Sequence, residues 1–360
     1  MTTLELVQAN LLSPVVLAFL LGAVAVWVRS DLRIPDGMYT GMSLYLLLAI
    51  GLKGGAALAK TPLGEVWLPT LAVLALGCAI PVWTYGVARG LGRLNVPDSA
   101  ALAAHYGSVS VVTFVASLSF LDAAGVAYEG YLPALVALLE VPAIAVAIAI
   151  ARVAGSGKEG GWGPALHEVF SGRSILLLVG GLVIGAASGP VGLAKVAPLF
   201  VEPFQGVLVL FLLEMGMVAA RRFRELRAVG AFLVLFGIGM PVLHGALGAW
   251  VGYLAGMSPG GTTVLGVLAA SASYIAAPAA VRVALPDANP GLYLTASLAI
   301  TFPFNLAVGI PLYHAIAQRV HAGNGTIPIF LGAAALVLLA LAALRRRPSV
   351  THLSPANRAT

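Results

Sequence analysis

Residues 98–120 read DSAALAAHYGSVSVVTFVASLSF, and this stretch decides the fold. It is apolar and long enough to cross a bilayer, for which a helix needs about 20 residues. Its centre carries the run HYGSVS (105–110), in which glycine weakens a helix and serine competes for backbone hydrogen bonds. Irregular backbone at membrane depth is tolerated only where protein buries it or where it lines a cavity. The stretch therefore predicts a membrane helix interrupted near its middle.

A second stretch repeats this pattern further along the chain. Residues 260–285 read GGTTVLGVLAASASYIAAPAAVRVAL, with serines, a tyrosine and a proline near the centre. Ser108 falls on Ser271 and Ser110 on Ser273, in both cases 163 residues further on. Two interrupted helices at equivalent positions of a repeat are therefore expected.

Other segments align at nearly the same offset. Residues 45–59 align with 208–222, Pro81 aligns with Pro241, and Pro142 aligns with Pro303. Five spans, an odd number, separate the copies, so the second copy must be inverted in the membrane. Such 5+5 inverted repeats are typical of secondary transporters, whose substrate sites lie where the repeats meet near the midplane. We expect the repeats at 1–154 and 174–320, joined by a linker at 155–173.

The composition excludes a water-soluble enzyme and a disordered chain. Of the 360 residues, 60% are hydrophobic and 9% are charged, and the mean hydropathy is +0.98. Soluble domains carry about 25% charged residues, and disorder needs low hydrophobicity. The single cysteine, Cys78, can form neither an internal disulfide nor a cysteine-based metal site. The chain is therefore predicted to be an all-α polytopic membrane protein.

Long apolar runs predict ten spans in the two repeats and an extra C-terminal helix at 327–344, followed by a tail at 345–360. The ten spans are 10–28, 38–59, 67–90, 98–121, 131–153, 174–189, 203–221, 228–255, 260–285 and 291–318.

The basic residues predict the orientation. The connections after odd-numbered spans contain twelve Lys and Arg, whereas the other connections and the end of span ten contain three. By the positive-inside rule the odd connections, including the linker, are cytoplasmic and the N-terminus is outside. Residues 1–10 contain Glu5 and no basic residue, which does not fit a cleaved signal peptide. We expect a multi-pass protein of the cell inner membrane.

The interrupted helices predict an ion site. The exposed N–H groups at the start of a helix carry about half a positive charge, so two such ends can hold an anion without Arg or Lys. Freed carbonyls and hydroxyls suit Na⁺, and Glu140 in span five and the polar residues of span ten add further oxygens. The candidate sodium ligands are Ser108, Ser110, Thr113, Glu140, Ser271, Ser273, Thr301 and Asn305.

Each of these features also has a structural interpretation. Gly and Ser allow close helix packing, and Glu140 can serve to hold helices together. Lys53 and Glu214 are interpreted as an ion pair or a subunit contact, His105 as a packing residue, and Asp98 as a helix cap.

Five segments together resemble the sodium-dependent bicarbonate transporter (SbtA) family. They are GLKGGAALA (51–59), AAHYGSVSVVTF (103–114), LLEVPA (138–143), ASASYIAAPAAVR (270–282) and ITFPFNLAVGIPLY (300–313).

The resemblance implies ten core helices in a 5+5 inverted repeat, a mobile core that moves like an elevator against a scaffold, and a homotrimer. It implies that HCO₃⁻ is bound at the broken helices with Na⁺ beside it, and that a cytoplasmic PII-like protein acts as regulator. The residues carried over for bicarbonate are Gly107, Ser108, Ser110, Ala272, Ser273 and Tyr274. The helix at 327–344 departs from the ten-helix family pattern.

We therefore expect a Na⁺-dependent bicarbonate symporter that is not an enzyme, with no cofactor beyond the coupling Na⁺ and no nucleic-acid partner. Two alternatives in the same class are a Na⁺-coupled transporter of another small monoanion and a cation/proton antiporter. An intramembrane hydrolase and a sensor without transport are the alternatives from other classes.

Overall fold

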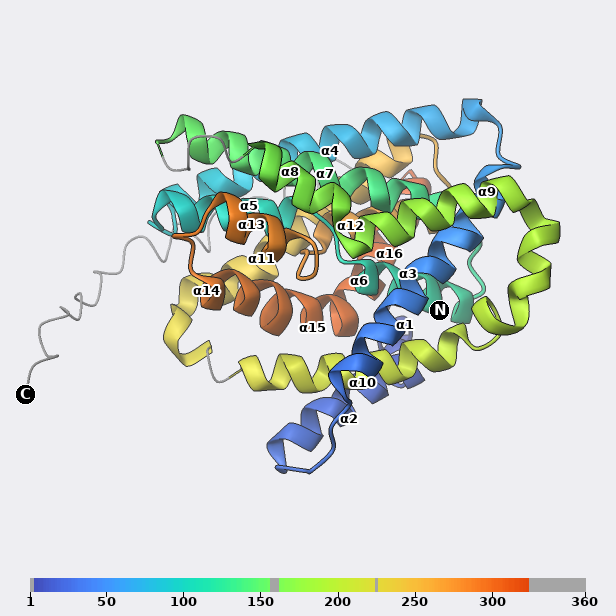
Figure 1. The fold of residues 1–360 in the computed structure, drawn as a ribbon, viewed down its shortest axis with the longest axis horizontal. Coiled ribbons are helices and arrows are strands. Elements are labelled where there is room, and N and C mark those ends of the chain that lie inside the picture. Colours follow the sequence, from blue (N-terminus) through green and yellow to red (C-terminus); the bar gives the residue numbers. More distant parts are fainter. Residues whose placement is uncertain (1–2, 156–161, 224–225, 324–360) are drawn as a thin grey trace, which may run out of the picture.

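The chain folds into a bundle of helices, seen in a computed structural model that describes residues 3–155, 162–223 and 226–323 (Figure 1). Within these residues there are helices and no strands. Eight described helical segments are long and apolar enough to cross a membrane: Asp36–Leu58, Leu63–Gly90, Val96–Ala123, Leu132–Val153, Arg173–Phe200, Phe204–Arg222, Gly230–Leu254 and Pro290–His321. Two shorter apolar helices accompany them, Pro14–Trp27 and Pro259–Ala270. The all-α, multi-pass membrane prediction is thereby confirmed.

Helices α3 (Asp36–Leu58) and α9 (Arg173–Phe200) form one closely packed pair. Their backbones approach at Gly55 and Gly185. A Cβ on Gly55 would collide with the carbonyl oxygen of Leu182, and a Cβ on Gly185 with that of Leu52. Small residues are what allows membrane helices to pack backbone against backbone.

Helices α2 (Pro14–Trp27) and α10 (Phe204–Arg222) form a second pair of the same kind. A Cβ on Gly22 would collide with the carbonyl oxygen of Leu213, and a Cβ on Gly216 with that of Phe19. Close glycine contacts of the same kind thus occur in both helix pairs. We refer to these four helices as the paired helices.

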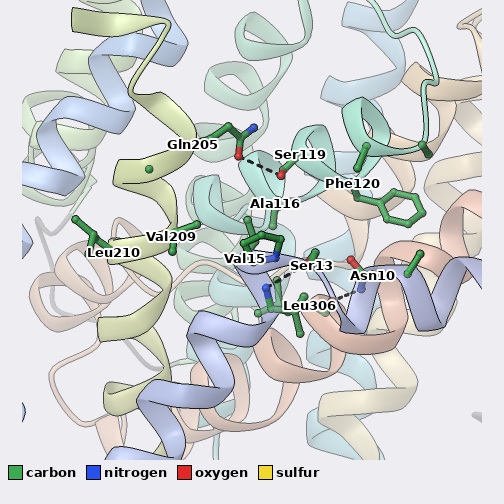
Figure 2. A pocket seen from close by; sticks show the side chains of 16 residues that line it. Asn10, Ser13, Val15, Ala116, Ser119, Phe120, Gln205, Val209, Leu210 and Leu306 are labelled. Atoms are coloured by element: carbon green, nitrogen blue, oxygen red, sulfur yellow. Dashed lines mark hydrogen bonds between the residues drawn. The ribbon is translucent and has the colours of Figure 1, made fainter.

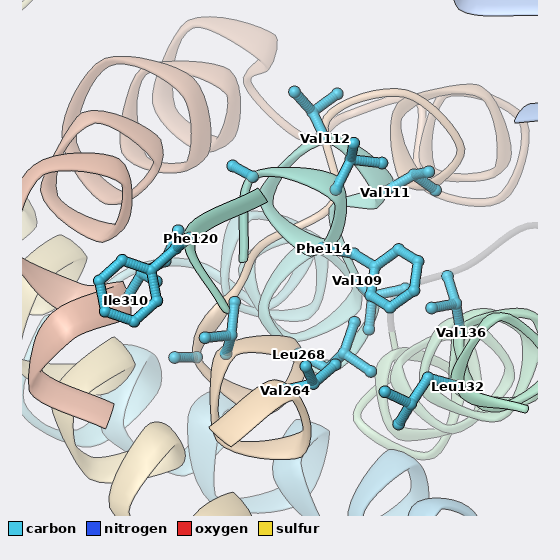
Figure 3. Close-up of a cluster of buried hydrophobic side chains, with 14 of the residues drawn as sticks. Val109, Val111, Val112, Phe114, Phe120, Leu132, Val136, Val264, Leu268 and Ile310 are labelled. Atoms are coloured by element: carbon cyan, nitrogen blue, oxygen red, sulfur yellow. The ribbon is translucent and has the colours of Figure 1, made fainter. Parts of the chain in front are cut away.

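The remaining helices surround the two interrupted spans. In the first half, α4 (Leu63–Gly90) and α7 (Leu132–Val153) pack against α5 (Val96–Gly107), which α6 (Val111–Ala123) continues. In the second half, α11 (Leu226–Leu254) and the last span pack against α12 (Pro259–Ala270), which α13 (Ala277–Ala284) continues. Figure 3 shows apolar side chains around α6, such as Leu132 of α7, Leu268 of α12 and Ile310 of α16 (Ile310–His321).

The last span is not a regular α-helix. It runs through α14 (Pro290–Leu294), a π-helix η1 (Thr295–Thr301), α15 (Phe302–Phe304), a π-helix η2 (Asn305–Gly309) and α16 (Ile310–His321). Pro303 lacks a backbone N–H and so cannot continue the α-helical ladder. π-Helical turns are rare and are frequently found at functional sites, and here they contain Thr301 and Asn305.

The structure corrects one of the expected span boundaries and agrees with another. The first span begins at Pro14 rather than at residue 10, because Ser13 caps a new helix and a separate helix α1 (Thr3–Leu11) precedes it. The sixth span is expected to end at 189, and Gly189 has φ 61° and ψ −167°, which are not helical angles. Two helices therefore meet at a kink at Gly189, and the second continues to Phe200.

Three further expectations concern polar segments. The linker contains a helix, α8 (Trp162–Ser171), that packs against α13 and α9. Among the described residues Lys53 lies over the ring of Phe204, 5.1 Å from its centroid, and does not form the expected pair with Glu214. The predicted helix at 327–344 and the tail lie outside the described residues.

Candidate ion site at the two helix breaks

The first interruption follows Gly107. Ser108 has φ −86° and ψ 176°, and Ser110 is extended as well, so the helix stops for three residues before α6 begins at Val111. A Cβ on Gly107 would lie 2.5 Å from the ring of Pro81, so only glycine allows α5 to end against α4. The Ser110 hydroxyl then caps α6 by accepting the amide of Thr113 at 3.2 Å.

The second interruption is longer and occupies residues 271–276. Ser271 has φ −80° and ψ 165°, close to the conformation of Ser108 at the first break. The Ser273 hydroxyl accepts the amide of Ala277, the first residue of α13, at 3.2 Å. A side-chain oxygen therefore satisfies an amide at the start of the second half-helix in both breaks.

The two interruptions contact each other directly. The amide of Ser273 donates to the carbonyl of His105 at 2.8 Å, and the amide of Ser110 donates to the hydroxyl of Ser271 at 2.9 Å. Segments that are about 160 residues apart in the chain are thus joined by two buried hydrogen bonds. These bonds bring Ser110 to Ser271 and Ser273 to His105, and Gly107, Ser108 and Ala272 are neighbours of these residues in the chain.

A small cavity lies beside these bonds. It has a volume of about 10 Å³ and is lined by Ser110, Val111, Glu140, Tyr274 and other residues of α3, α9 and the breaks. Val111 is the first residue of α6, so the cavity is at the positive end of that half-helix. No lysine or arginine lines it.

Three buried polar atoms at the first break and on α7 have no hydrogen-bond partner in the described part of the chain: the hydroxyl of Ser108, the Nε2 atom of His105 and the Oε2 atom of Glu140. Ser108 and Glu140 are each 1% exposed. The hydroxyl of Tyr274, which lines the cavity, interacts with the side chain of Ser110. Buried polar groups are nearly always paired, so the unpaired Glu140 oxygen at the cavity indicates a place where a ligand supplies the missing partner.

Thr301 lies behind the first break and not at the cavity. Its hydroxyl is 2.7 Å from the hydroxyl of Tyr106 and donates to the carbonyl of Gly237 at 2.7 Å. In an α-helix the carbonyl of Gly237 would accept the backbone amide of residue 241. Residue 241 is a proline, which has no N–H to donate. Thr301 therefore satisfies an acceptor that the α11 proline leaves free.

Asn305 lies behind the second break. Its amide nitrogen donates to the carbonyl of Ala270, the last residue of α12, at 2.8 Å. Its Oδ1 atom accepts the hydroxyl of Tyr313 at 3.0 Å. Thr113 follows the Ser110 cap in the first turn of α6 and is 1% exposed. Among the candidate sodium ligands, Ser110 and Glu140 line the cavity, whereas Thr301 and Asn305 support the helix ends.

Each broken helix is also held at its beginning by the loop that follows the other one. The carboxylate of Glu129, after α6, accepts the amide of Ser258 at 2.6 Å and its hydroxyl at 3.0 Å, at the start of α12. The carboxylate of Asp98 in α5 accepts the amide of Asn289, after α13, at 2.7 Å. Asp98 is thus not the cap of α5; the cap is Asn95, which accepts the amide of Asp98.

His105 is a packing residue in this arrangement. Its Nδ1 atom lies 2.7 Å from the carbonyl of Ala101, and its ring centre is 4.4 Å from that of Tyr293. Among the cavity-lining residues that were not singled out from the sequence, Leu47 of α3 and Ser174 of α9 come from outside the breaks, α6 and α7. Neither has a sequence signal, because an apolar residue or a serine inside a span is ordinary.

Residues 14–318 match a family model described as the Na⁺-dependent bicarbonate transporter superfamily. The matched stretch begins at α2, includes both interruptions and ends in α16. A comparison with individually curated proteins gives no match. Because the model covers most of the chain and the site described above, the chain belongs to the Na⁺-dependent bicarbonate transporter superfamily.

Proposed function

We propose that the chain is a Na⁺-dependent bicarbonate symporter whose site is formed by the two helix interruptions. The observation that carries this proposal is that the unpaired buried oxygens of Ser108 and Glu140 occur beside two hydrogen-bonded breaks, where Glu140, Ser110 and Tyr274 line a small cavity.

The anion is bound by amides and hydroxyls. The start of α6 offers N–H groups that have no acceptor within the helix, together with the hydroxyls of Ser110 and Tyr274. Neutral donors of this kind hold a monoanion without a permanent charge on the protein. Gly107, Ala272 and Ser273 shape the backbone from which these donors project.

Sodium binds beside the anion and completes its neutralisation. Hard cations take oxygen ligands, and the Ser108 hydroxyl and the Glu140 carboxylate are the unpaired oxygens at this place. The hydroxyls of Thr113, Ser271 and Ser273 and the polar groups of Thr301 and Asn305 surround them as further ligands or as supports.

The site must open before bicarbonate enters. A cavity of about 10 Å³ is about the size that one water molecule needs, and HCO₃⁻ is larger. Leu47 and Ser174 close the cavity from the paired helices, whereas the other walls come from the breaks and α7. We therefore propose that the helices carrying the breaks move as a core against a scaffold of paired helices, in an elevator-like manner.

Several further features belong to the same proposal. The equivalent glycine contacts of the paired helices and the similar backbone angles of Ser108 and Ser271 support a 5+5 inverted repeat. The charge pattern supports an N-terminus outside the cell inner membrane and a cytoplasmic linker. A homotrimer and a cytoplasmic PII-like regulator are proposed from the family alone.

The energetics fit one Na⁺ moving with one HCO₃⁻. Such a pair carries no net charge, so only the chemical Na⁺ gradient contributes to uptake. A tenfold gradient is worth about 1.4 kcal/mol and sustains about tenfold accumulation of the anion.

Uptake into proteoliposomes tests the proposal. Labelled bicarbonate should accumulate with an inward Na⁺ gradient and should only equilibrate when choline replaces Na⁺. Equal uptake in both conditions would reject the coupling.

A cation/proton antiporter is the second candidate, because the Glu140 carboxyl is buried and its Oε2 atom has no partner. It predicts that a Na⁺ gradient drives proton movement without bicarbonate. A pH-sensitive dye inside bicarbonate-free proteoliposomes distinguishes the two, since the symporter leaves the dye signal unchanged.

A further inference from the structure

A large apolar recess lies away from the helix breaks. Its volume is about 540 Å³, and it lies between the α1–α2 segment, α6, α10 and Leu306 of the last span (Figure 2). Volumes of this size are typical of sites for small organic ligands. None of Ser108, Ser110, Glu140 and Tyr274 lines it, so it is separate from the proposed ion site.

The base of the recess is buried and apolar. Val16, Ala116 and Leu306 are 2%, 4% and 1% exposed, and Phe120 closes the base beside His314. The polar groups around it are largely paired: the amide nitrogen of Asn10 donates to the carbonyl of Leu306 at 2.8 Å. The interior therefore offers contact area for hydrocarbon and few free groups for a polar ligand.

The mouth of the recess opens on an apolar surface. Leu210 lines the recess and is 43% exposed. Helix α2, which forms another wall, presents Leu17, Leu20 and Leu21 at 45%, 45% and 58% exposure. Because Leu210 both lines the recess and is exposed, the recess reaches the apolar outer surface of the helices.

One polar pair stands at the end of the recess. The hydroxyl of Ser119 in α6 donates to the Oε1 atom of Gln205 in α10 at 3.2 Å, and both side chains line the recess (Figure 2). Gln205 is the second residue of α10, so this pair lies near a helix end, where a span meets the interfacial region. The recess thus combines an apolar interior with a polar rim at interfacial depth.

We propose that this recess binds one acyl chain of a bilayer phospholipid, whose head group lies at the Gln205–Ser119 rim. Apolar volume that opens into a bilayer is filled by hydrocarbon, and each buried CH₂ adds favourable free energy. Two walls of the recess are formed by α2 and α10, which belong to the paired helices, and two by α6 and the last span. If the core moves as proposed above, the bound acyl chain separates the core from the paired helices and affects how they move past each other. This consequence alone rests on the proposed function.

Photo-crosslinking in the membrane tests the proposal without any transport measurement. The protein is reconstituted with phosphatidylglycerol that carries a diazirine in one acyl chain, irradiated and digested, and the adducts are mapped by mass spectrometry. Adducts are expected at the buried base, on Ala116, Phe120 or Leu306, in addition to those on the exposed leucines of α2. Adducts on the α2 surface alone would overturn the proposal.

Gly206 provides a variant that fills the recess. It lines the recess, and a Cβ added to it would meet nothing within 4 Å, so Gly206→Leu enlarges a residue at the wall of the recess with open space at its Cβ. The base adducts should fall about tenfold relative to the surface adducts, which a loss of about 1.4 kcal/mol of binding would give. Unchanged base adducts would overturn the proposal.

Gly86→Leu is the matched control, because Gly86 is exposed on α4, lies outside the recess and also has open space at its Cβ. It should leave the base adducts unchanged. An equal fall in both variants would overturn the assignment to the recess. Bicarbonate uptake measured on the same samples tests the proposed function separately, since the adducts form whether or not the protein transports.

Discussion

Ser271→Ala tests the contact between the two interruptions. The Ser271 hydroxyl accepts the amide of Ser110 at 2.9 Å and donates to the carbonyl of Leu268 at 2.8 Å. Ser271 is 1% exposed, so water does not replace either bond after the substitution. The variant therefore leaves one buried amide and one buried carbonyl without this partner.

The expected loss of stability follows from these two bonds. Leaving a buried polar group unpaired costs about 1–3 kcal/mol. Side-chain hydrogen bonds between membrane helices average about 0.6 kcal/mol in double-mutant cycles, because the reference state also finds partners. Together these values give about 1–2 kcal/mol for Ser271→Ala, which corresponds to a fall in melting temperature of about 2–6 °C.

Ser117→Ala is the matched control. Ser117 is fully buried in α6, and its hydroxyl donates only to the carbonyl of Phe114 in the same helix, at 2.6 Å. Thermal unfolding in detergent and Na⁺-dependent uptake should both be affected more by Ser271→Ala than by Ser117→Ala. Equal effects in the two variants would refute the view that the bond across the breaks holds the site together.

Three other substitutions test separate parts of the structure. Gly185→Leu should prevent assembly of the folded protein, because its side chain would collide with the backbone of α3 at Leu52. Size-exclusion chromatography after expression measures this, and a normal monodisperse peak would contradict the packing. Glu140→Gln keeps the size of the side chain but removes the carboxylate. It should raise the Na⁺ concentration needed for half-maximal uptake about tenfold or more, because a tenfold change corresponds to the loss of a ligand worth about 1.4 kcal/mol. An unchanged Na⁺ dependence excludes Glu140 as a ligand. Glu129→Gln weakens the two hydrogen bonds that the Glu129 carboxylate accepts from Ser258 at the start of α12. It should lower the free energy of unfolding by about 1 kcal/mol, the typical value for a lost helix cap. An unchanged melting temperature would show that these bonds are not stabilising.

The sequence predicts the interruptions because they depend on local chemistry. Glycine and serine at the centre of an apolar span weaken the helix wherever it packs, and Pro278 fixes where the second half-helix can start. The first break is three residues long and the second is six, however, and this difference is set by tertiary contacts such as the bond from Ser273 to His105.

The roles of the polar residues in the last span depend on the packing of distant helices. Thr301 and Asn305 are recognisable as unusual in an apolar span, but the sequence does not show that they satisfy Gly237 and Ala270. The apolar recess has no sequence signal at all, because the residues around it are ordinary for a membrane helix. Voids of this kind arise from how helices are placed and not from the residues that line them.

Equilibrium binding of labelled bicarbonate to purified Ser108→Ala tests the central claim most directly. The Ser108 hydroxyl has no hydrogen-bond partner among the described residues, so its removal should leave the melting temperature unchanged. Thr84→Val is the control, because the Thr84 hydroxyl is also buried and unpaired but lies in α4, outside both breaks. The account predicts saturable bicarbonate binding in Na⁺ and not in choline for the wild type and Thr84→Val, and clearly weaker binding for Ser108→Ala. Bicarbonate binding that is independent of Na⁺, or equal in Ser108→Ala and the wild type, would contradict it.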